Sequence, residues 1–385
     1  MPDLTPSQRT WKIFKLNTAA MAGLAFIVLI MLVAILGYLI MPDATPDANN
    51  MAIQLSLKKP GAKYMLLGIR KQEPVDTVGI FTKVLHGQAD FYREIPITSY
   101  YFVKDSIYVN QYIGDEDKAE RKVYSIIQVA TGQKPTSPQN QNIKALKQQI
   151  ITKQILHKTF WFGTDIYGRD MLSRMLLGTR VSLSVGLMSV IISMLLGVSI
   201  GAMAGYFGGW LDAALSWLMN ILWALPALLL VIAISFALGK GLWEIFVAVG
   251  LSMWVEVARL VRGQVIALKQ VEYIEAARSM GFGNARIITK HILPNIIGPI
   301  LVLAASNFAT AILLEAGLSF LGFGAQPPTP TWGSMIRENY GYIVMDAAYL
   351  AVLPGLAIML LVYSFNLITT GLRDAFDIKS QNARI

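Results

Sequence analysis

The sequence predicts an all-α membrane protein with six transmembrane helices and a small α+β extracytoplasmic domain between the first two. Hydrophobic residues make up 54% and charged residues 15% of the chain, and the mean hydropathy is +0.50, outside the range of ordinary soluble domains. Several uncharged runs reach the roughly 20 residues that a helix needs to cross the hydrocarbon core. One long segment, 42–160, is instead polar. The chain therefore divides into membrane spans and one polar domain.

Six apolar runs give the expected spans. The first is too long for the apolar core of a signal peptide and has no small-residue cleavage site after it, so we expect it to stay as a membrane helix. The second and third are separated by the glycine-rich break GYFGGWLD. The expected spans are 18–41, 181–211, 213–239, 242–261, 296–314 and 347–370.

The fourth run, LWEIFVAVGLSMWVEVARLV, is the weakest of the six because it carries charge. We expect Glu244, Glu256 and Arg259 at the two ends of this span, where the membrane interface tolerates charged side chains. On that placement the middle of the span is apolar.

Positively charged residues set the expected orientation. Arg9, Lys12 and Lys15 precede the first span, and cytoplasmic flanks of membrane helices are enriched in Lys and Arg. With six spans, both termini and segment 271–295 face the cytoplasm, and segment 42–160 lies outside. We therefore expect a multi-pass protein of the inner (cytoplasmic) membrane, whose net charge of +9 needs no nucleic-acid partner.

The polar segment 42–160 is expected to form the outer domain. Its stretch ITSYYFVKDSIYVNQY is aromatic and β-branched like a strand, and SPQNQNIKALKQQIITKQIL begins as a loop and becomes helical. The chain has no cysteine, so no disulfide stabilises this domain. Two roles stay open for it: a structural spacer, or a docking site for an external protein.

The chain lacks the motifs of catalysis and cofactor binding. GTDIYGRD has the glycine spacing of a phosphate loop, but Arg169 and Asp170 stand where such a loop needs Lys and then Ser or Thr. The three histidines are scattered singly, which disfavours a metal site. No nucleophile, base and orienting acid occur together in a recognisable motif. We expect no enzyme activity, no cofactor and no metal in this chain.

Glu315 is an ionisable residue within the fifth apolar segment. At about 1.5 Å per helical residue it should lie near the outer end of that span. Two roles stay open: a carboxylate hydrogen-bonded to a neighbouring span, or part of an outer gate.

Segment 271–295, VEYIEAARSMGFGNARIITKHILPN, is expected to form a cytoplasmic helical hairpin. Gly281 and Gly283 permit the dihedral angles of a sharp reversal, and Pro294 ends the second helix. Small residues at Ala276, Ala277 and Gly281 allow close approach of a partner's backbone. One apolar face should hold Val271, Ile274, Ala277 and Gly281, and another Ile287, Ile288, His291 and Ile292. The alternatives are an amphipathic hairpin in the membrane interface and a DNA-reading helix-turn-helix.

Within this hairpin, EAARSMGFGNARIITKHILP resembles the EAA loop of bacterial ABC-importer permeases. FGTDIYGRDMLSRMLLGTRVSLSVG, AGYFGGWLD, EAGLSFLGFGAQPPTPTWGSMI and FNLITTGLRDAFD are similar to the second permease subunit of the dipeptide, oligopeptide and nickel importers. The resemblance covers 162–377 and the first span. It implies a type I importer permease with a cytoplasmic tail and first span at 1–41, the outer domain at 42–160, a five-helix permease domain at 161–370 and a tail at 371–385.

The resemblance also implies partners and site residues. The EAA loop of this family docks on a cytoplasmic ATPase, which gives Glu275, Ala276, Ala277, Gly281 and Pro294 a coupling role. The expected partners are a homologous permease, two ATPase subunits that bind ATP and Mg, an external solute-binding protein and membrane lipid. The expected function is peptide import by alternating access, with nickel or another small solute as the alternative within the family.

Two departures limit what the resemblance implies. Trp217 and Asn220 stand where relatives tend to have Arg and Asp, which weakens any transfer of substrate identity. The outer segment is longer than the usual link between the first two spans. Outside the family, a proton-coupled transporter is disfavoured because mid-membrane carboxylates are not expected, and a membrane-anchored sensor because six spans exceed its needs.

Overall fold

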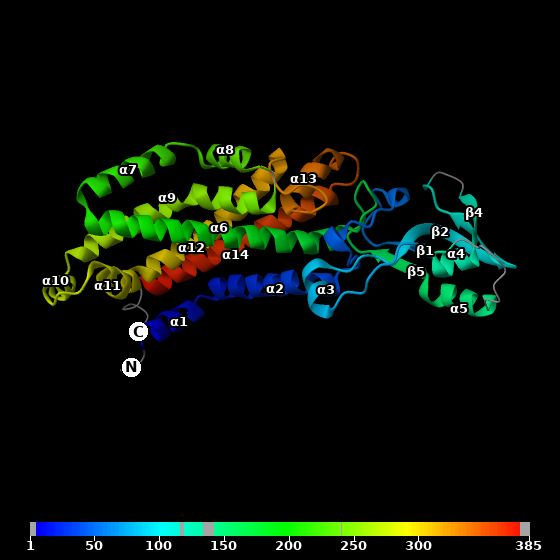
Figure 1. Cartoon of the computed structure of the whole chain (residues 1–385), viewed down its shortest axis with the longest axis horizontal. Coiled ribbons are helices and arrows are strands. Elements are labelled where there is room, and N and C mark those ends of the chain that lie inside the picture. The colour runs from blue at the N-terminus through cyan, green and yellow to red at the C-terminus, as the bar shows by residue number, and fades with distance from the viewer. Residues whose placement is uncertain (1–4, 116–118, 134–141, 240, 378–385) are drawn as a thin grey trace.

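The computed structural model describes residues 5–115, 119–133, 142–239 and 241–377. A bundle of long helices carries a β-sheet unit at one end, and the two termini lie at the other end (Figure 1). The bundle contains α1 (Pro6–Leu16), α2 (Thr18–Ile40), α6 (Met171–Phe207), α7 (Gly209–Trp223), α8 (Ala227–Leu238), α9 (Leu242–Lys269), α10 (Glu272–Ser279), α11 (Asn284–Arg286), α12 (Ile297–Leu321), α13 (Trp332–Asn339) and α14 (Tyr349–Phe376).

Several of these helices are long and apolar enough to cross a membrane. Among the described residues, Thr18–Ile40, Met171–Phe207, Asn284–Leu321 and Tyr349–Phe376 meet this condition by length and composition. The pair α7 and α8 adds a fifth span if the two helices count as one. The chain is thus mostly helical, with four to five spans of clear composition.

The third expected span, 213–239, is not one continuous helix. α7 ends at Trp223, α8 begins at Ala227, and the two helices meet at an angle of 97°. Pro226 stands at the start of α8, where it has no N–H to continue the helix and disfavours helical geometry in the residue before it. The run is therefore a broken helix.

The expected fourth span, 242–261, is part of a longer helix, and Glu244 lies in the first turn of that helix as expected. α9 continues as a helix to Lys269, so Glu256 and Arg259 lie about 20 Å and about 15 Å before its last residue at about 1.5 Å per residue. These charges keep α9 outside the set of clearly apolar spans. Apolar residues such as Met253, Val255 and Val257 are buried on either side of Glu256 in the sequence.

A stripe of glycines brings α6 and α9 into close contact. A Cβ atom built on Gly201 would lie 2.4 Å from the carbonyl oxygen of Ala258, and one built on Gly197 would lie 2.7 Å from that of Trp254. Any larger residue would push the helices apart, so the small residues fix a short interhelical distance. α9 is thereby held against the longest helix of the bundle.

The sheet unit lies between α2 and α6 in the sequence. Its strands form one antiparallel sheet in the order β4-β3-β2-β1-β5. The helices α4 (Ile126–Thr131) and α5 (Ile143–Lys153) cover one face, burying Ile107, Val109, Val129 and Ile150. The short helix α3 (Ile80–His86) lies beside α2 (Figure 1). The strands are β1 (Ala62–Arg70), β2 (Tyr92–Val103), β3 (Ser106–Gln111), β4 (Glu120–Ser125) and β5 (Ile155–Phe160).

Candidate functional site

The hairpin lies at the end of the bundle that carries both termini, opposite the sheet unit (Figure 1). α10 ends in a tight turn at Gly281, whose φ of +79° is the left-handed conformation that favours glycine. The N–H groups of Gly281 and Phe282 donate to the carbonyls of Arg278 and Ala277 and close the turn. The chain then continues through α11, a π-helical turn (Ile287–Ile292) and a 3-10 turn (Leu293–Ile296) into α12.

The two predicted glycines play different roles. Gly281 needs its left-handed backbone, and no other atom lies within 4 Å of a Cβ built on it. Gly283 has φ −67° and ψ 150°, which any residue can adopt, so the prediction that it supplies special dihedral angles is wrong. The reversal depends on one glycine.

One face of the hairpin packs on the chain's own bundle. Ile274, Ala277, Ile287 and Ile292 are buried in a cluster with residues of α6 and α9. Val271, expected on the same face, is 40% exposed, because α10 begins only after it. The hairpin is therefore anchored by short apolar side chains.

The opposite side of the hairpin is open. Glu275, Ala276 and Gly281 are exposed, and so is Pro294 in the 3-10 turn. Ala277 is buried and belongs to the anchoring face instead. Four of the five predicted coupling residues are thus exposed, and the fifth, Ala277, packs against the bundle.

Polar and ring contacts fix the turn against the end of α6. The Tyr206 hydroxyl donates to Asn284 Oδ1 at 2.9 Å, and Arg278 lies 5.9 Å from the centroid of the Tyr206 ring. Arg286 lies 4.1 Å from the centroid of Phe282, which also stacks on His291. These contacts give the hairpin a defined position at the end of the bundle.

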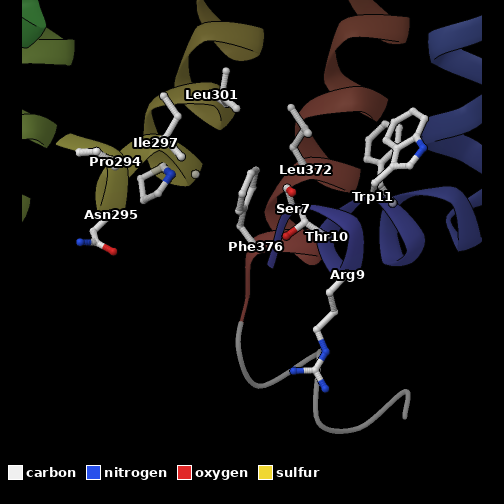
Figure 2. A pocket seen from close by; sticks show the side chains of 13 residues that line it. Ser7, Arg9, Thr10, Trp11, Pro294, Asn295, Ile297, Leu301, Leu372 and Phe376 are labelled. Atoms are coloured by element: carbon white, nitrogen blue, oxygen red, sulfur yellow. The ribbon is translucent and has the colours of Figure 1, made fainter. Parts of the chain in front are cut away.

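A cavity of about 810 Å³ lies beside the hairpin, between α1, the start of α12 and the end of α14. Figure 2 shows Pro294 and Asn295 on one side, Phe376 and Leu372 behind, and Arg9, Thr10 and Trp11 of α1 on the other side. This end of the bundle is therefore hollowed next to Pro294, one of the exposed coupling residues.

Glu315 is fully buried in the last two turns of α12. Its carboxylate accepts hydrogen bonds from Ser319 Oγ at 2.7 Å and from Ser182 Oγ of α6 at 3.4 Å. A buried carboxylate needs such partners. They tie α12 to α6.

Sequence reasoning missed an ion cluster that gives GTDIYGRD its role. Asp165 accepts hydrogen bonds from the backbone N–H groups of Tyr167 and Arg169, and its Oδ2 lies 2.6 Å from Arg169 Nε and 3.6 Å from Arg174 Nε. Glu338 of α13 pairs with both arginines, at 3.1 Å and 3.5 Å. The loop therefore joins the start of α6 to α13. Four charged residues within 165–174 were the feature of the sequence that could have predicted an ion cluster.

The broken helix α7–α8 meets α9 through polar contacts. Asn220 Oδ1 accepts a hydrogen bond from Arg259 at 2.6 Å, and the Arg259 guanidinium lies 4.6 Å from the centroid of Trp223. Asp212 forms a bidentate pair with Arg262 at 2.5 Å and 2.7 Å. Trp217 is 67% exposed. Asn220 therefore holds a cation of α9, a role that the sequence did not indicate.

No cluster of three or more metal-binding side chains occurs within the described ranges of the chain. The hairpin, the buried Glu315 and the exposed Glu256 of α9 are the candidate functional features.

Two family profiles match the chain. Residues 197–380 match the binding-protein-dependent transport system inner membrane component, and residues 5–60 match the N-terminal TM domain of oligopeptide transport permease C. Most of the sheet unit lies between the two matched ranges.

Individual known proteins are also similar to parts of this chain. A glutathione transport system permease protein of Pectobacterium atrosepticum is 45% identical over 219 residues, 57% of this chain and 72% of the relative. A dipeptide transport system permease protein of Alkalihalophilus pseudofirmus is 44% identical over 222 residues, 58% of this chain and 73% of the relative. A methionine ABC transporter in inward-facing conformations has 22% identity and a TM-score of 0.42, over 52% of this chain and 97% of that chain.

Proposed function

Since the chain belongs to the binding-protein-dependent transport system inner membrane component family, we propose that it is the permease subunit of an ATP-driven peptide importer. Relatives named for glutathione and dipeptide transport support peptides as the cargo class. The chain itself forms half of the translocation path and works by alternating access. It performs no chemistry of its own.

The proposal includes the other subunits that such a machine needs. A homologous permease completes the path, two cytoplasmic ATPase subunits bind ATP and Mg, and a solute-binding protein delivers the peptide from outside. The chain itself needs no cofactor. Membrane lipid surrounds the bundle, whose outward side chains on α2 include exposed Leu29, Leu32 and Ile35.

The proposed topology has six spans. α9 serves as a span together with α2, α6, α12, α14 and the broken pair α7–α8. The proposed parts are a tail and first span at 1–41, an outer domain at 42–160, a permease domain at 161–370 and a tail at 371–385. Both termini and the hairpin 271–295 face the cytoplasm. The location of the hairpin and the sheet unit at opposite ends of the bundle supports this arrangement (Figure 1).

The hairpin is the proposed coupling element. The observation that carries this proposal is its two-sided construction: Ile274 and Ala277 are buried against the bundle, while Glu275 and Ala276 are exposed on the same short helix. A partner that moves α10 therefore moves α6 and α9 with it. Gly281 and Pro294 shape the exposed side.

Two features at the other end belong to the proposal as well. Glu315 links α12 to α6 next to α13, where it would hold an outer gate closed. The sheet unit would receive the loaded solute-binding protein. The backbone N–H of Lys58, just before β1, donates to Thr164 Oγ1 of GTDIYGRD, which would give a docked protein a route to α6.

Single cysteines test the proposal directly, because the chain has none of its own. A cysteine at exposed Ala276 should cross-link to an ATPase subunit and react with an impermeant maleimide only from the cytoplasmic side. A cysteine at Lys59, whose side chain is 74% exposed near the sheet unit, should react only from outside and form no ATPase cross-link. Labelling of both positions from the same side would refute the topology.

A further inference from the structure

Glu256 lies in the middle of α9 without a charged partner. None of the ion pairs or side-chain hydrogen bonds found among the described residues involves its carboxylate. Its neighbours Val255 and Val257 are buried against the bundle, but Glu256 itself is exposed. A carboxylate about 20 Å inside a helix that crosses the bundle is costly to leave facing lipid.

The surroundings of Glu256 combine polar and apolar residues. A cavity of about 470 Å³ lies between α9, the first half of α12 and the end of α14. Charged residues within spans face cavities that admit water rather than lipid. Its lining includes the charged residues Glu256, Arg373 and Asp377, the hydroxyl-bearing Ser306 and Thr369, and the apolar Leu260 and Val302. Because Arg373 belongs to the last turn of α14 at the hairpin end, the cavity extends toward the proposed cytoplasmic side.

The other charges on the same stretch of α9 already have partners. Arg259 lies over the Trp223 ring and donates to Asn220, and Arg262 pairs with Asp212. Glu256 therefore differs from these arginines because no hydrogen bond or ion pair is found for its carboxylate. An ionised carboxylate accepts hydrogen bonds only, so the complementary ligand is a cation that donates them.

We propose that Glu256 binds the protonated amino group of the cargo peptide as the peptide passes the cytoplasmic half of the path. This inference rests on the proposed function and specifies the cargo as peptides with a free α-amine. An ammonium group has three donors for the carboxylate and the hydroxyl oxygens of the cavity. The apolar walls formed by Leu260 and Val302 contact side chains without distinguishing their polar groups. The site then recognises the amino terminus of a peptide and does not select for its side chains.

A divalent cation is the competing ligand for a carboxylate. A metal site of all-protein ligands needs several donors, and the described residues contain no group of three His, Cys, Asp or Glu side chains around Glu256 or elsewhere. The structure thus favours the ammonium ion, and the experiment includes nickel as a separate arm.

The experiment uses the full importer reconstituted in vesicles with its binding protein and ATPases. Uptake of trialanine is compared with uptake of N-acetyl-trialanine, and the ratio of the two rates is the selectivity. Glu256→Gln should lower this ratio about tenfold or more, because a hydrogen bond between charged groups is lost only for the free amine. Dividing the ratio of the variant by that of the wild type cancels any preference of the binding protein, which is the same in both.

A matched control comes from the same helix. Glu244 lies in the first turn of α9, away from the cavity, and Glu244→Gln should leave the ratio unchanged. Glu256→Asp, which keeps the charge, should retain most of the selectivity and covers the case in which Glu256→Gln does not assemble. Assembly is checked by co-purification of the ATPases.

The outcomes separate this inference from the proposed function. Equal loss of both peptides in Glu256→Gln, no change in the ratio, or a wild type that takes up the acetylated peptide equally well would each overturn the role of Glu256 while leaving peptide import intact. Nickel uptake that depends on Glu256 would overturn the proposal and would assign a metal ion, instead of an ammonium group, as the ligand of Glu256. A wild-type importer that takes up no peptide would overturn the proposed function, and this inference with it.

Discussion

Gly281 ends α10 with φ +79°, a conformation that costs about 1–2 kcal/mol for a residue with a Cβ atom. Because the space around this position is open, the cost is one of backbone strain and not of steric overlap within the chain. Gly283, two residues later, has an ordinary backbone. Substituting the same larger residue at Gly281 and at Gly283 therefore separates the effect of backbone conformation from the effect of side-chain size.

The first prediction compares valine substitutions at these two glycines. Gly281→Val should distort the turn and lower the amount of ATPase that co-purifies with the permease several-fold, with normal membrane insertion. Gly283→Val should retain most of the binding, since φ −67° and ψ 150° suit valine. Equal binding by the two variants would show that the left-handed turn does not shape the docking surface.

Asp165 neutralises two buried arginines, and its removal is the second prediction. The Asp165 and Arg169 side chains are 2% and 4% exposed. Asp165→Asn leaves buried positive charge, so the free energy of unfolding should fall by about 3 kcal/mol or more. The thermal unfolding midpoint of the purified chain in detergent measures this. Asp346→Asn, at an exposed pair with Lys59, is the control and should leave the midpoint unchanged. A midpoint that Asp165→Asn does not lower would mean that the cluster adds no stability.

At the scale of elements, the packing of α6 on α9 depends on glycines of α6. A methyl group at Gly201 meets the backbone of Ala258 at 2.4 Å, whereas a methyl group at Gly263 of α9 meets no atom within 4 Å. Alanine favours a helix over glycine at both positions. The two substitutions therefore differ only in the steric overlap that the added methyl group causes.

The third prediction follows from this difference. Gly201→Ala should destabilise the chain by about 1–3 kcal/mol through overpacking, and Gly263→Ala should be neutral or slightly stabilising. Chemical denaturation in detergent, followed by tryptophan fluorescence, measures both. A stable Gly201→Ala variant would mean that the two helices can separate without cost.

The elements also show what sequence can and cannot predict. Long apolar runs predicted the positions of α2, α12 and α14 because hydrophobicity over 20 residues is a property of the chain itself. The bend between α7 and α8 escaped prediction because the run from Ile221 to Leu238 is apolar apart from Ser235, and the local effect of Pro226 breaks the helix within it. Glu256 was expected near the end of the fourth span because the apolar pattern stops there, and the helix continues beyond that point to Lys269.

The same limit applies to the candidate site. Glu275 and Gly281 were found by their motif, which is local in sequence. Asp165 and Glu338 come together over a long stretch of chain, and the contact of Asn220 with Arg259 also depends on the fold. Such contacts have no signature in the spacing of residues.

At the scale of the whole molecule, the sheet unit and the hairpin lie at opposite ends of the bundle (Figure 1). Ala62 at the start of β1 pairs with Phe160 at the end of β5, so the sheet unit leaves and rejoins the bundle at one place. A short linker can therefore replace the segment between these two residues.

The fourth prediction uses this geometry. Replacing residues 63–159 with a short Gly/Ser linker should leave the spans inserted and the ATPases bound, because the hairpin is far from the sheet. Peptide uptake should fall at low concentrations of loaded binding protein and recover at high concentrations. Unaltered concentration dependence would assign the sheet unit to a spacer role.

The central claim is that this chain imports peptides with energy from a separate ATPase. The most direct measurement is uptake of labelled peptide into vesicles that contain the chain, its partner permease, the ATPases and the binding protein. The account predicts uptake that requires ATP, stops when the ATPases cannot hydrolyse it and is unaffected when the proton gradient is collapsed. Uptake driven by the proton gradient without ATP, or no peptide uptake by the intact assembly, would contradict it.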